Sequence, residues 1–237
     1  MNDRSALLVS LTAALRGNGL GPAWGSGRWA RPLADDHRRA LLELIERGQE
    51  AFARHHFVPG HFTASAFVLS PDGAELLLIR HAKLGLWLQP GGHIEPDDAD
   101  LTAAALRELR EETSVVEATL LEPHFDVDVH VIPAFGEQPA HLHHDVRILL
   151  RASTREIAQG DDALDAAWFP LSLLATGSGP LGAGLGTDES VRRVARHLAA
   201  IPLEIRLDER PETPRASQLD NGNQNDSNRR REGNQAP

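Results

Sequence analysis

Three glutamates spaced for one face of a helix are the residues of this sequence best placed to do chemistry. Glu108 precedes Glu111 by three positions and Glu112 by four, and residues at these spacings are neighbours on an α-helix. Like charges so arranged repel, by roughly 0.2–0.5 kcal/mol per pair in an isolated helix. A divalent cation or neighbouring arginines must therefore offset the repulsion, and carboxylate oxygens suit a hard ion such as Mg²⁺ or Mn²⁺.

The elements around these glutamates would position such a site. Ala105, Leu106 and Leu109 form an apolar face that would hold the helix against a sheet. Upstream, Gly91 and Gly92 follow a predicted strand, and glycine lets a backbone carbonyl approach the same ion closely. The Arg-Glu-x-x-Glu-Glu pattern alone is more typical of a solvated acidic helix face. Together with the glycines and the strand, the pattern favours a metal site.

The whole segment resembles the box of the Nudix hydrolases. That box runs Gly, five residues, Glu, seven residues, Arg-Glu, an aliphatic, any residue, Glu-Glu, any residue, Gly and an aliphatic. The sequence from Gly92 to Val115 follows it with three departures. Asp98 replaces the first Glu, eight residues rather than seven separate it from Arg107, and Ser114 replaces the final Gly. None of these departures changes a glutamate of the predicted helix.

The resemblance implies a fold, a metal site and a reaction. The fold is an α/β/α sandwich around a mixed β-sheet. Glu111 and Glu112 are implied as ligands of Mg²⁺ or Mn²⁺, and Glu108 as a ligand or general base. Arg107 belongs to the same catalytic set, and the Gly91 carbonyl is a further candidate ligand. A metal-bound water would attack phosphorus and cleave the diphosphate linkage of a nucleoside diphosphate derivative, such as a nucleotide sugar or ADP-ribose.

A second polar group lies on two predicted strands. Asp126, Asp128 and His130 alternate with valines, and His141, His143, Asp145 and Arg147 alternate with Leu142, His144 and Val146, so each run presents one polar face. The solvated side of a hairpin is the alternative, but Asp is disfavoured in strands, which favours a role in the site. The carboxylates that could add a metal ligand are Asp126, Asp128 and Asp145. The candidates for contact with phosphate or base are His81, Lys83, His93, His130, His143 and Arg147.

The chain divides into a helical extension over 1–57, the resembling domain over 58–203 and a tail over 204–237. The tail is rich in Pro, Asn, Gln, Gly and Arg, so it buries too little apolar surface to offset its ordering entropy and is expected to be disordered. The expected helices span 5–15, 35–55, 101–112 and 187–199. The expected strands span 62–69, 75–79, 116–121, 125–132, 146–152 and 166–169.

Composition excludes several classes of protein. A formal net charge of −10 argues against a nucleic-acid duplex as partner, which would need a basic face. Because there is no cysteine, disulfides, thiolate zinc sites and cysteine nucleophiles are excluded. No apolar stretch approaches the roughly 20 residues that span a bilayer, and the N-terminus lacks a signal-peptide layout. We expect a cytoplasmic protein without a membrane partner, and a homodimer is left open.

Two other functions compete with hydrolysis. One is a non-catalytic nucleotide-binding or regulatory domain on the same fold, whose usual sign is loss of a box glutamate; all three are present. The other is a histidine-rich metal-binding protein, since five of the twelve histidines fall between His124 and His144. Binding of Zn²⁺ or Ni²⁺ without Mg²⁺-dependent turnover would favour it.

Overall fold

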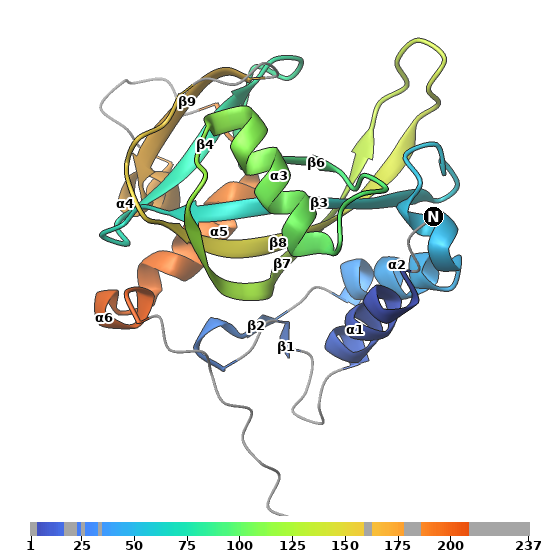
Figure 1. The fold of residues 1–237 in the computed structure, drawn as a ribbon, viewed down its shortest axis with the longest axis horizontal. Helices are drawn as coiled ribbons and strands as arrows, with labels where there is room; N and C mark the ends of the chain where they lie inside the picture. The colour runs from blue at the N-terminus through green and yellow to red at the C-terminus, as the bar shows by residue number, and fades with distance from the viewer. Residues whose placement is uncertain are drawn as a thin grey trace, which may run out of the picture.

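The computed structural model describes residues 4–16, 23–24, 27–32, 35–158, 163–177 and 186–208. At its centre is a mixed seven-stranded sheet (Figure 1), in which β5, β4, β3, β8 and β7 lie side by side in that order. Strand β6 pairs with β3, and β9 pairs with β4. The strands are β3 (Gly60–Leu69), β4 (Glu75–His81), β5 (Trp87–Leu88), β6 (Gly91–His93), β7 (Ala118–Ile132), β8 (His141–Ala152) and β9 (Ala163–Pro170).

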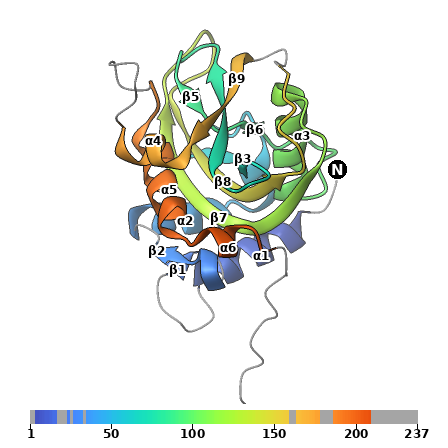
Figure 2. The same ribbon diagram turned by 90° about the vertical axis from the view of Figure 1, so that its left-hand side faces the viewer.

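Helices cover both faces of this sheet. Figure 2 shows α3 on one side and α4 with α5 on the other, so the predicted α/β/α sandwich with a mixed sheet is confirmed. A separate two-stranded sheet joins β1 (Ala23–Trp24) to β2 (Arg31–Pro32). The helices are α1 (Ser5–Arg16), η1 (Gly27–Trp29), α2 (Asp35–Ile45), η2 (Gly48–Phe52), α3 (Leu101–Thr113), α4 (Leu171–Thr176), α5 (Glu189–Ala200) and α6 (Leu203–Arg206).

Strand β3 separates two apolar cores, because its side chains alternate between the faces of the sheet. Phe62 and Val68 pack in one core with α3 and the N-terminal helices. Phe67 and Leu69 pack in the other core with α4 and α5. All ten residues of β3 are buried, and β3 pairs in parallel with β8 along its whole length. Strand β3, with which β6 pairs, is therefore packed on both faces.

The N-terminal helices pack on the core that contains α3. The apolar residues that they bury there are Leu11, Leu15, Leu41, Leu44, Ala51 and Phe52. The predicted single helix over 35–55 is wrong in its second half, because α2 ends at Ile45 and the short helix η2 begins at Gly48. Gly48 has a φ of +66°, a left-handed conformation that ends helices and that glycine adopts without steric cost.

The two strands predicted over 116–121 and 125–132 form one strand, β7. The pairing of β7 with β8 shifts register on both sides of Glu122, next to Pro123, which has no N–H to donate. Such bulges let a strand continue past a residue that interrupts the hydrogen-bond ladder. Strand β8 also begins earlier than predicted, at His141.

The C-terminal part of the chain is described only as far as residue 208. Residues 204–206, expected to belong to the tail, are helical in α6. The rest of the predicted tail, 209–237, lies outside the described residues, as does most of the glycine-rich loop over 177–186. Among the described helices, none combines the length and apolar character needed to cross a membrane.

Candidate active site

Helix α3 presents the box glutamates because its opposite face is anchored in the core. Asp100 caps the first turn, where its Oδ1 accepts a hydrogen bond from the Ala103 N–H at 2.7 Å. Ala105 and Leu109 are fully buried in the core shared with β3. The cap fixes where the helix begins and the apolar face fixes its rotation, so the acidic face is turned toward β6 and the loop that follows it.

Glu112 is tied to the backbone of β6. Its side chain is buried, and its Oε2 accepts a hydrogen bond from the Gly91 N–H at 2.9 Å. Gly91 pairs with Ser65 of β3, and a Cβ at position 91 would lie 2.2 Å from the Ser65 Cβ and 2.8 Å from the Ala64 carbonyl oxygen. Only glycine lets β6 lie this close to β3, and that closeness brings Gly91 to Glu112.

Glu108 lies against the neighbouring glycine. A Cβ on Gly92 would lie 2.6 Å from Glu108 Oε1, so the carboxylate fills the space that a side chain there would need. Burial raises the pKa of the Glu108 carboxyl; the Arg107 guanidinium opposes this rise, and the charges of Glu111 and Glu95 add to it. A raised pKa makes this carboxylate a stronger base, which suits a general base.

Arg107 joins four parts of the box. Its Nε and Nη2 donate to the two oxygens of Asp98 at 3.1 and 3.0 Å. The same Nη2 donates to the His93 carbonyl at 2.8 Å. Its Nη1 donates to Glu108 Oε1 at 2.9 Å and to Glu111 Oε2 at 3.2 Å. The hydrogen bonds to Asp98 raise the pKa of Arg107, so this arginine is a fixed positive charge that offsets repulsion on the acidic face.

The departures from the Nudix box have structural explanations. Asp98 is buried, and besides its paired contact with Arg107 its Oδ2 accepts from the Glu95 N–H at 2.7 Å. The shorter acid therefore orders the longer loop. Ser114 adopts a φ of 59°, the left-handed cap that glycine usually provides, and its N–H donates to the Arg110 carbonyl at 2.9 Å. A residue with a Cβ costs roughly 1–2 kcal/mol in that conformation.

The donor set of the box fits a hard divalent cation. Glu108 and Glu112 are fixed beside the paired glycines, whereas the Glu111 side chain is 59% exposed. Among the described residues, three histidines rather than the box glutamates form a group whose ligand atoms all lie within 4.8 Å of one another. Carboxylates together with a backbone carbonyl are the ligands that Mg²⁺ and Mn²⁺ prefer.

The polar faces of β7 and β8 meet as expected. Asp126 pairs with Arg147, Asp128 with Asp145, and His130 with His143. Arg147 Nε donates to Asp145 Oδ2 at 2.8 Å, and its Nη1 donates to Asp126 Oδ2 at 3.1 Å. Its Nη2 lies 3.4 Å from Asp128 Oδ2. Since the Arg147 side chain is only 1% exposed, we propose a structural role for it rather than contact with substrate.

Further donors complete this buried network. Arg193 Nη2 donates to Asp126 Oδ2 at 3.1 Å. Asp145 accepts from the hydroxyls of Thr63 at 3.1 Å and Ser65 at 2.7 Å, and from Gln89 Nε2 at 3.3 Å. A carboxylate so engaged must lose partners before it can bind a metal ion. The arginines and hydroxyls thus explain why aspartates are tolerated within these strands.

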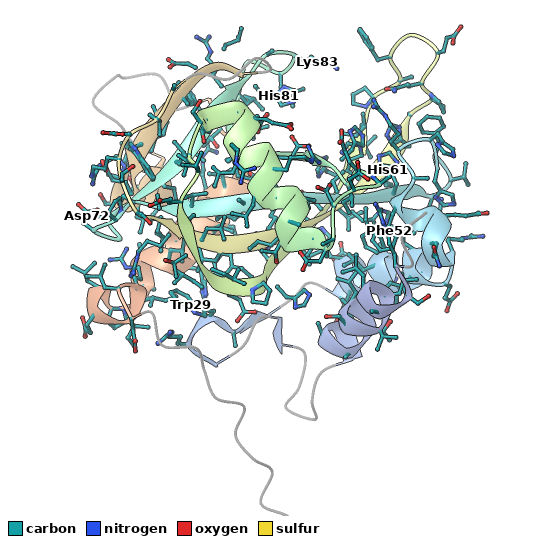
Figure 3. All side chains as sticks on the ribbon, viewed as in Figure 1. Trp29, Phe52, His61, Asp72, His81 and Lys83 are labelled. Atoms are coloured by element: carbon teal, nitrogen blue, oxygen red, sulfur yellow. The ribbon has the colours of Figure 1, made fainter. Side chains whose placement is uncertain are left out.

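His81 ends β4, and Lys83 lies in the turn that follows (Figure 3). His81 Nδ1 accepts from the backbone N–H groups of Lys83 at 3.2 Å and Leu84 at 3.4 Å, so this imidazole organises the turn. The exposed Lys83 ammonium lies 5.7 Å from the ring centroid of Phe135, whose side chain is 74% exposed at the tip of the β7–β8 hairpin. Turn and hairpin therefore meet, and Lys83 remains a proposed contact for phosphate.

Comparison with known proteins identifies the family. Residues 59–185 match the family model of the NUDIX domain, which is more than half of the 237 residues. The chain belongs to the Nudix family. The family and the enzyme class expected from the box, a Nudix hydrolase, are thereby confirmed. No curated protein matches this Nudix chain.

Solved structures with a similar fold are distant in sequence. A NUDIX-family hydrolase from Clostridium perfringens is 19% identical, with a TM-score of 0.45 over 59% of this chain and 96% of that chain. The C. elegans Ap4A hydrolase is 17% identical, with a TM-score of 0.43 over 59% and 95%. The NUDIX domain of Shewanella oneidensis NrtR, complexed with ADP ribose, is 20% identical, with a TM-score of 0.41 over 58% and 85%. Similarity at this level carries no argument about substrate.

One residue near the Nudix box, His61, was not predicted from the sequence to belong to a site. His61 lies in the fully buried strand β3, and its ring centroid is 5.1 Å from that of His93 and 4.8 Å from that of His143. A usable signal was present, because His61, Thr63 and Ser65 alternate with apolar residues and so share one face with the polar residues of β8.

Two glycine variants of this Nudix protein should separate catalysis from stability. In Gly92→Ala, the new Cβ must displace the flexible end of Glu108, and a displacement of about 1 Å can cost about 100-fold in rate. We therefore expect kcat to fall by about 100-fold while Tm changes little. Steady-state kinetics and thermal melting would check this.

The matched control is Gly91→Ala. Its Cβ would meet the Ser65 Cβ and the Ala64 backbone, which cannot move aside, so the overpacking should cost about 1–3 kcal/mol and lower Tm by about 2–12 °C. A Gly92→Ala protein with wild-type kcat would show that the Glu108 position seen here does not matter for catalysis.

Proposed function

We propose that this Nudix protein hydrolyses the diphosphate linkage of a nucleoside diphosphate derivative, with Mg²⁺ or Mn²⁺ as cofactor. The observation that carries the proposal is the arrangement of Glu108 and Glu112 against the two glycines of β6. Both carboxylates are fixed by α3 on one side and by a backbone on the other. Side chains held in this way by packing and hydrogen bonds are what a preorganised metal site requires.

The residues that would hold the cation are Glu108, Glu111 and Glu112, with the Gly91 carbonyl beside them. When bound, the cation neutralises the diphosphate oxygens and lowers the pKa of a bound water. Glu111 is the most exposed of the three carboxylates, so it can turn toward an incoming ion at little cost. Glu112 retains its hydrogen bond from Gly91 and keeps the site attached to the sheet.

Glu108 is the proposed acceptor of the water proton. Burial raises the pKa of its carboxyl, which moves it toward the pH at which a base both stays ionised and accepts a proton. Arg107 donates to Glu108 Oε1 and thereby fixes the direction of the carboxylate. The proton would pass from the attacking water to Glu108 as the new bond to phosphorus forms. The bond from that phosphorus to the bridging oxygen would break, and the other phosphate would leave with this oxygen.

The proposed substrate is a small nucleotide derivative rather than a nucleic-acid duplex. The net charge of −10 gives the chain no excess of basic groups for a phosphate backbone. Lys83, on the turn after β4, is the proposed contact for the substrate phosphates. A cytoplasmic location, which fits a cysteine-free chain, is part of the same proposal.

A substrate panel tests this function. The wild-type protein would be incubated with ADP-ribose, nucleotide sugars, dinucleoside polyphosphates and nucleoside triphosphates, each with Mg²⁺, with Mn²⁺ and with a chelator. We expect at least one diphosphate-linked compound to yield two phosphate-bearing products by mass, only when the cation is present. Calorimetric binding of a panel member without any turnover would point instead to a non-catalytic regulatory domain.

A further inference from the structure

Three histidines that are distant in the sequence meet on one face of the sheet. His61 comes from β3, His93 from β6 and His143 from β8, and Figure 3 labels His61 near the base of the β7–β8 hairpin. His61 lies opposite His143 in the parallel pair, and β6 brings in His93 two register positions away. A ligand nitrogen of each imidazole lies within 4.8 Å of the other two.

The central imidazole has one nitrogen paired and one nitrogen buried without a partner. His61 is 0% exposed, and its Nδ1 lies 3.2 Å from the His56 carbonyl oxygen. A carbonyl only accepts hydrogen bonds, so Nδ1 carries the proton and Nε2 carries the lone pair. Nε2 is buried and has no hydrogen-bond partner among the described residues. This is the tautomer of a metal-binding histidine, whose other ring nitrogen donates to a carbonyl or carboxylate.

Neutral imidazole is the form that binds metals. Burial is the main cause that lowers the pKa of His61 to about 4, and the charges of neighbouring histidines add to it. An imidazole that stays unprotonated near pH 7 keeps a lone pair free for a bound cation.

The spacing and chemistry of the cluster select the kind of ion. Imidazole nitrogens suit Zn²⁺ and similar transition metals, whereas Mg²⁺ prefers oxygen. Zinc binds imidazole nitrogen at about 2.0–2.1 Å, which places the nitrogens of a tetrahedral site about 3.4 Å apart. The ligand nitrogens of the three histidines lie within 4.8 Å of one another, so small side-chain rotations would bring them to the separation that zinc requires.

We propose that His61, His93 and His143 bind one transition-metal ion of the Zn²⁺ class, at a site separate from the box carboxylates. Three protein ligands leave the fourth position of a tetrahedral ion open to water or to a ligand oxygen. His93 directly follows Gly92, and the His93 carbonyl accepts a hydrogen bond from Arg107 at 2.8 Å. An ion bound to His93, His61 and His143 would therefore link the box loop to β3 and β8. The site thus adds a metal of a different class beside the proposed hydrolytic centre.

Cobalt spectroscopy tests this site without reference to turnover. Tag-free, metal-stripped protein would be titrated with Co²⁺, with Mg²⁺ in excess throughout to occupy the carboxylate site. We expect one equivalent to bind with the intense visible absorption of a four-coordinate ion, and Zn²⁺ to displace it. His143→Asn, at a half-buried position, should weaken binding by more than about 100-fold, because removing even an outer-sphere partner costs 10- to 100-fold.

Two matched variants make the result decisive. His55→Asn removes an exposed histidine outside the cluster and should leave the cobalt spectrum unchanged, as should Glu112→Gln in the box. His61→Asn should abolish the cobalt absorption if this variant folds. If His61→Asn does not fold, cobalt binding by His143→Asn tests the site instead. Absence of the four-coordinate spectrum, unchanged binding in His143→Asn, or its loss in Glu112→Gln would each overturn the proposal.

Discussion

Replacing Glu112 by glutamine is expected to lower kcat by at least about 100-fold, while the protein stays folded. Outer-sphere partners of a metal ligand already account for 10- to 100-fold in activity, so the loss of a charged ligand should cost no less. The side-chain carbonyl of the new glutamine can still accept the hydrogen bond from the Gly91 N–H, and one negative charge fewer on the acidic face relieves repulsion. Kinetics with the substrate found in the panel and thermal melting would measure both effects.

Glu43→Gln is the control for this charge change, because Glu43 is exposed on α2 and belongs to the N-terminal helices. It should leave kcat and Tm as they are. A Glu112→Gln protein that turns over at the wild-type rate would remove Glu112 from the metal site, and a drop in Tm of many degrees would show that its role is structural.

Replacing Arg147 by methionine is expected to destabilise the protein by about 3–5 kcal/mol, the usual cost of removing one partner from a buried ion pair. Arg147 contacts Asp126, Asp128 and Asp145 with a side chain that is 1% exposed. Without it, those carboxylates keep fewer donors in a buried setting. For a chain of this length the loss corresponds to a fall in Tm of roughly 6–20 °C, measurable by calorimetry.

Two further variants test the cause of that fall. Arg193→Met should have a smaller effect, because the Arg193 side chain is 32% exposed and water can replace it. Adding Asp126→Asn to Arg147→Met should restore part of the lost stability, since one buried carboxylate fewer has then lost its hydrogen bond from Arg147. If the double variant were as unstable as the sum of the single variants, charge compensation would not explain the network.

The parts of the fold that follow local patterns could be predicted from the sequence. Helix α3 has strong helix formers and an apolar stripe, and it was predicted to within one residue. The hairpin between β3 and β4 has Pro71 and Gly73 in its turn, where Gly73 takes a φ of +68° and the Ser70 hydroxyl donates to Asp72. In both cases the deciding interactions lie within a few residues of one another.

The parts that depend on distant partners could not be predicted. The sequence predicted only that Gly91 lies near the glutamates. It could not predict the hydrogen bond from Gly91 to Glu112, because that contact needs β6 to pair with β3. The alternation that places Asp126 and Arg147 on one polar face was visible in the sequence. Arg193, however, comes from α5. Only the packing of α5 against the sheet makes these candidate metal ligands part of a buried ion-pair network. The alternation at His61 was also visible, but its neighbours His93 and His143 belong to two other strands, so the cluster itself could not be predicted.

We propose that water attacks phosphorus at the box of this Nudix protein with a divalent cation bound to its glutamates. The most direct measurement is hydrolysis of the substrate found in the panel in ¹⁸O-labelled water with Mg²⁺ or Mn²⁺, with products analysed by mass. We expect one labelled oxygen in one phosphate-bearing product, formed by the wild-type protein and almost absent with Glu112→Gln. Label in a product without phosphate, or equal label with both proteins, would contradict it.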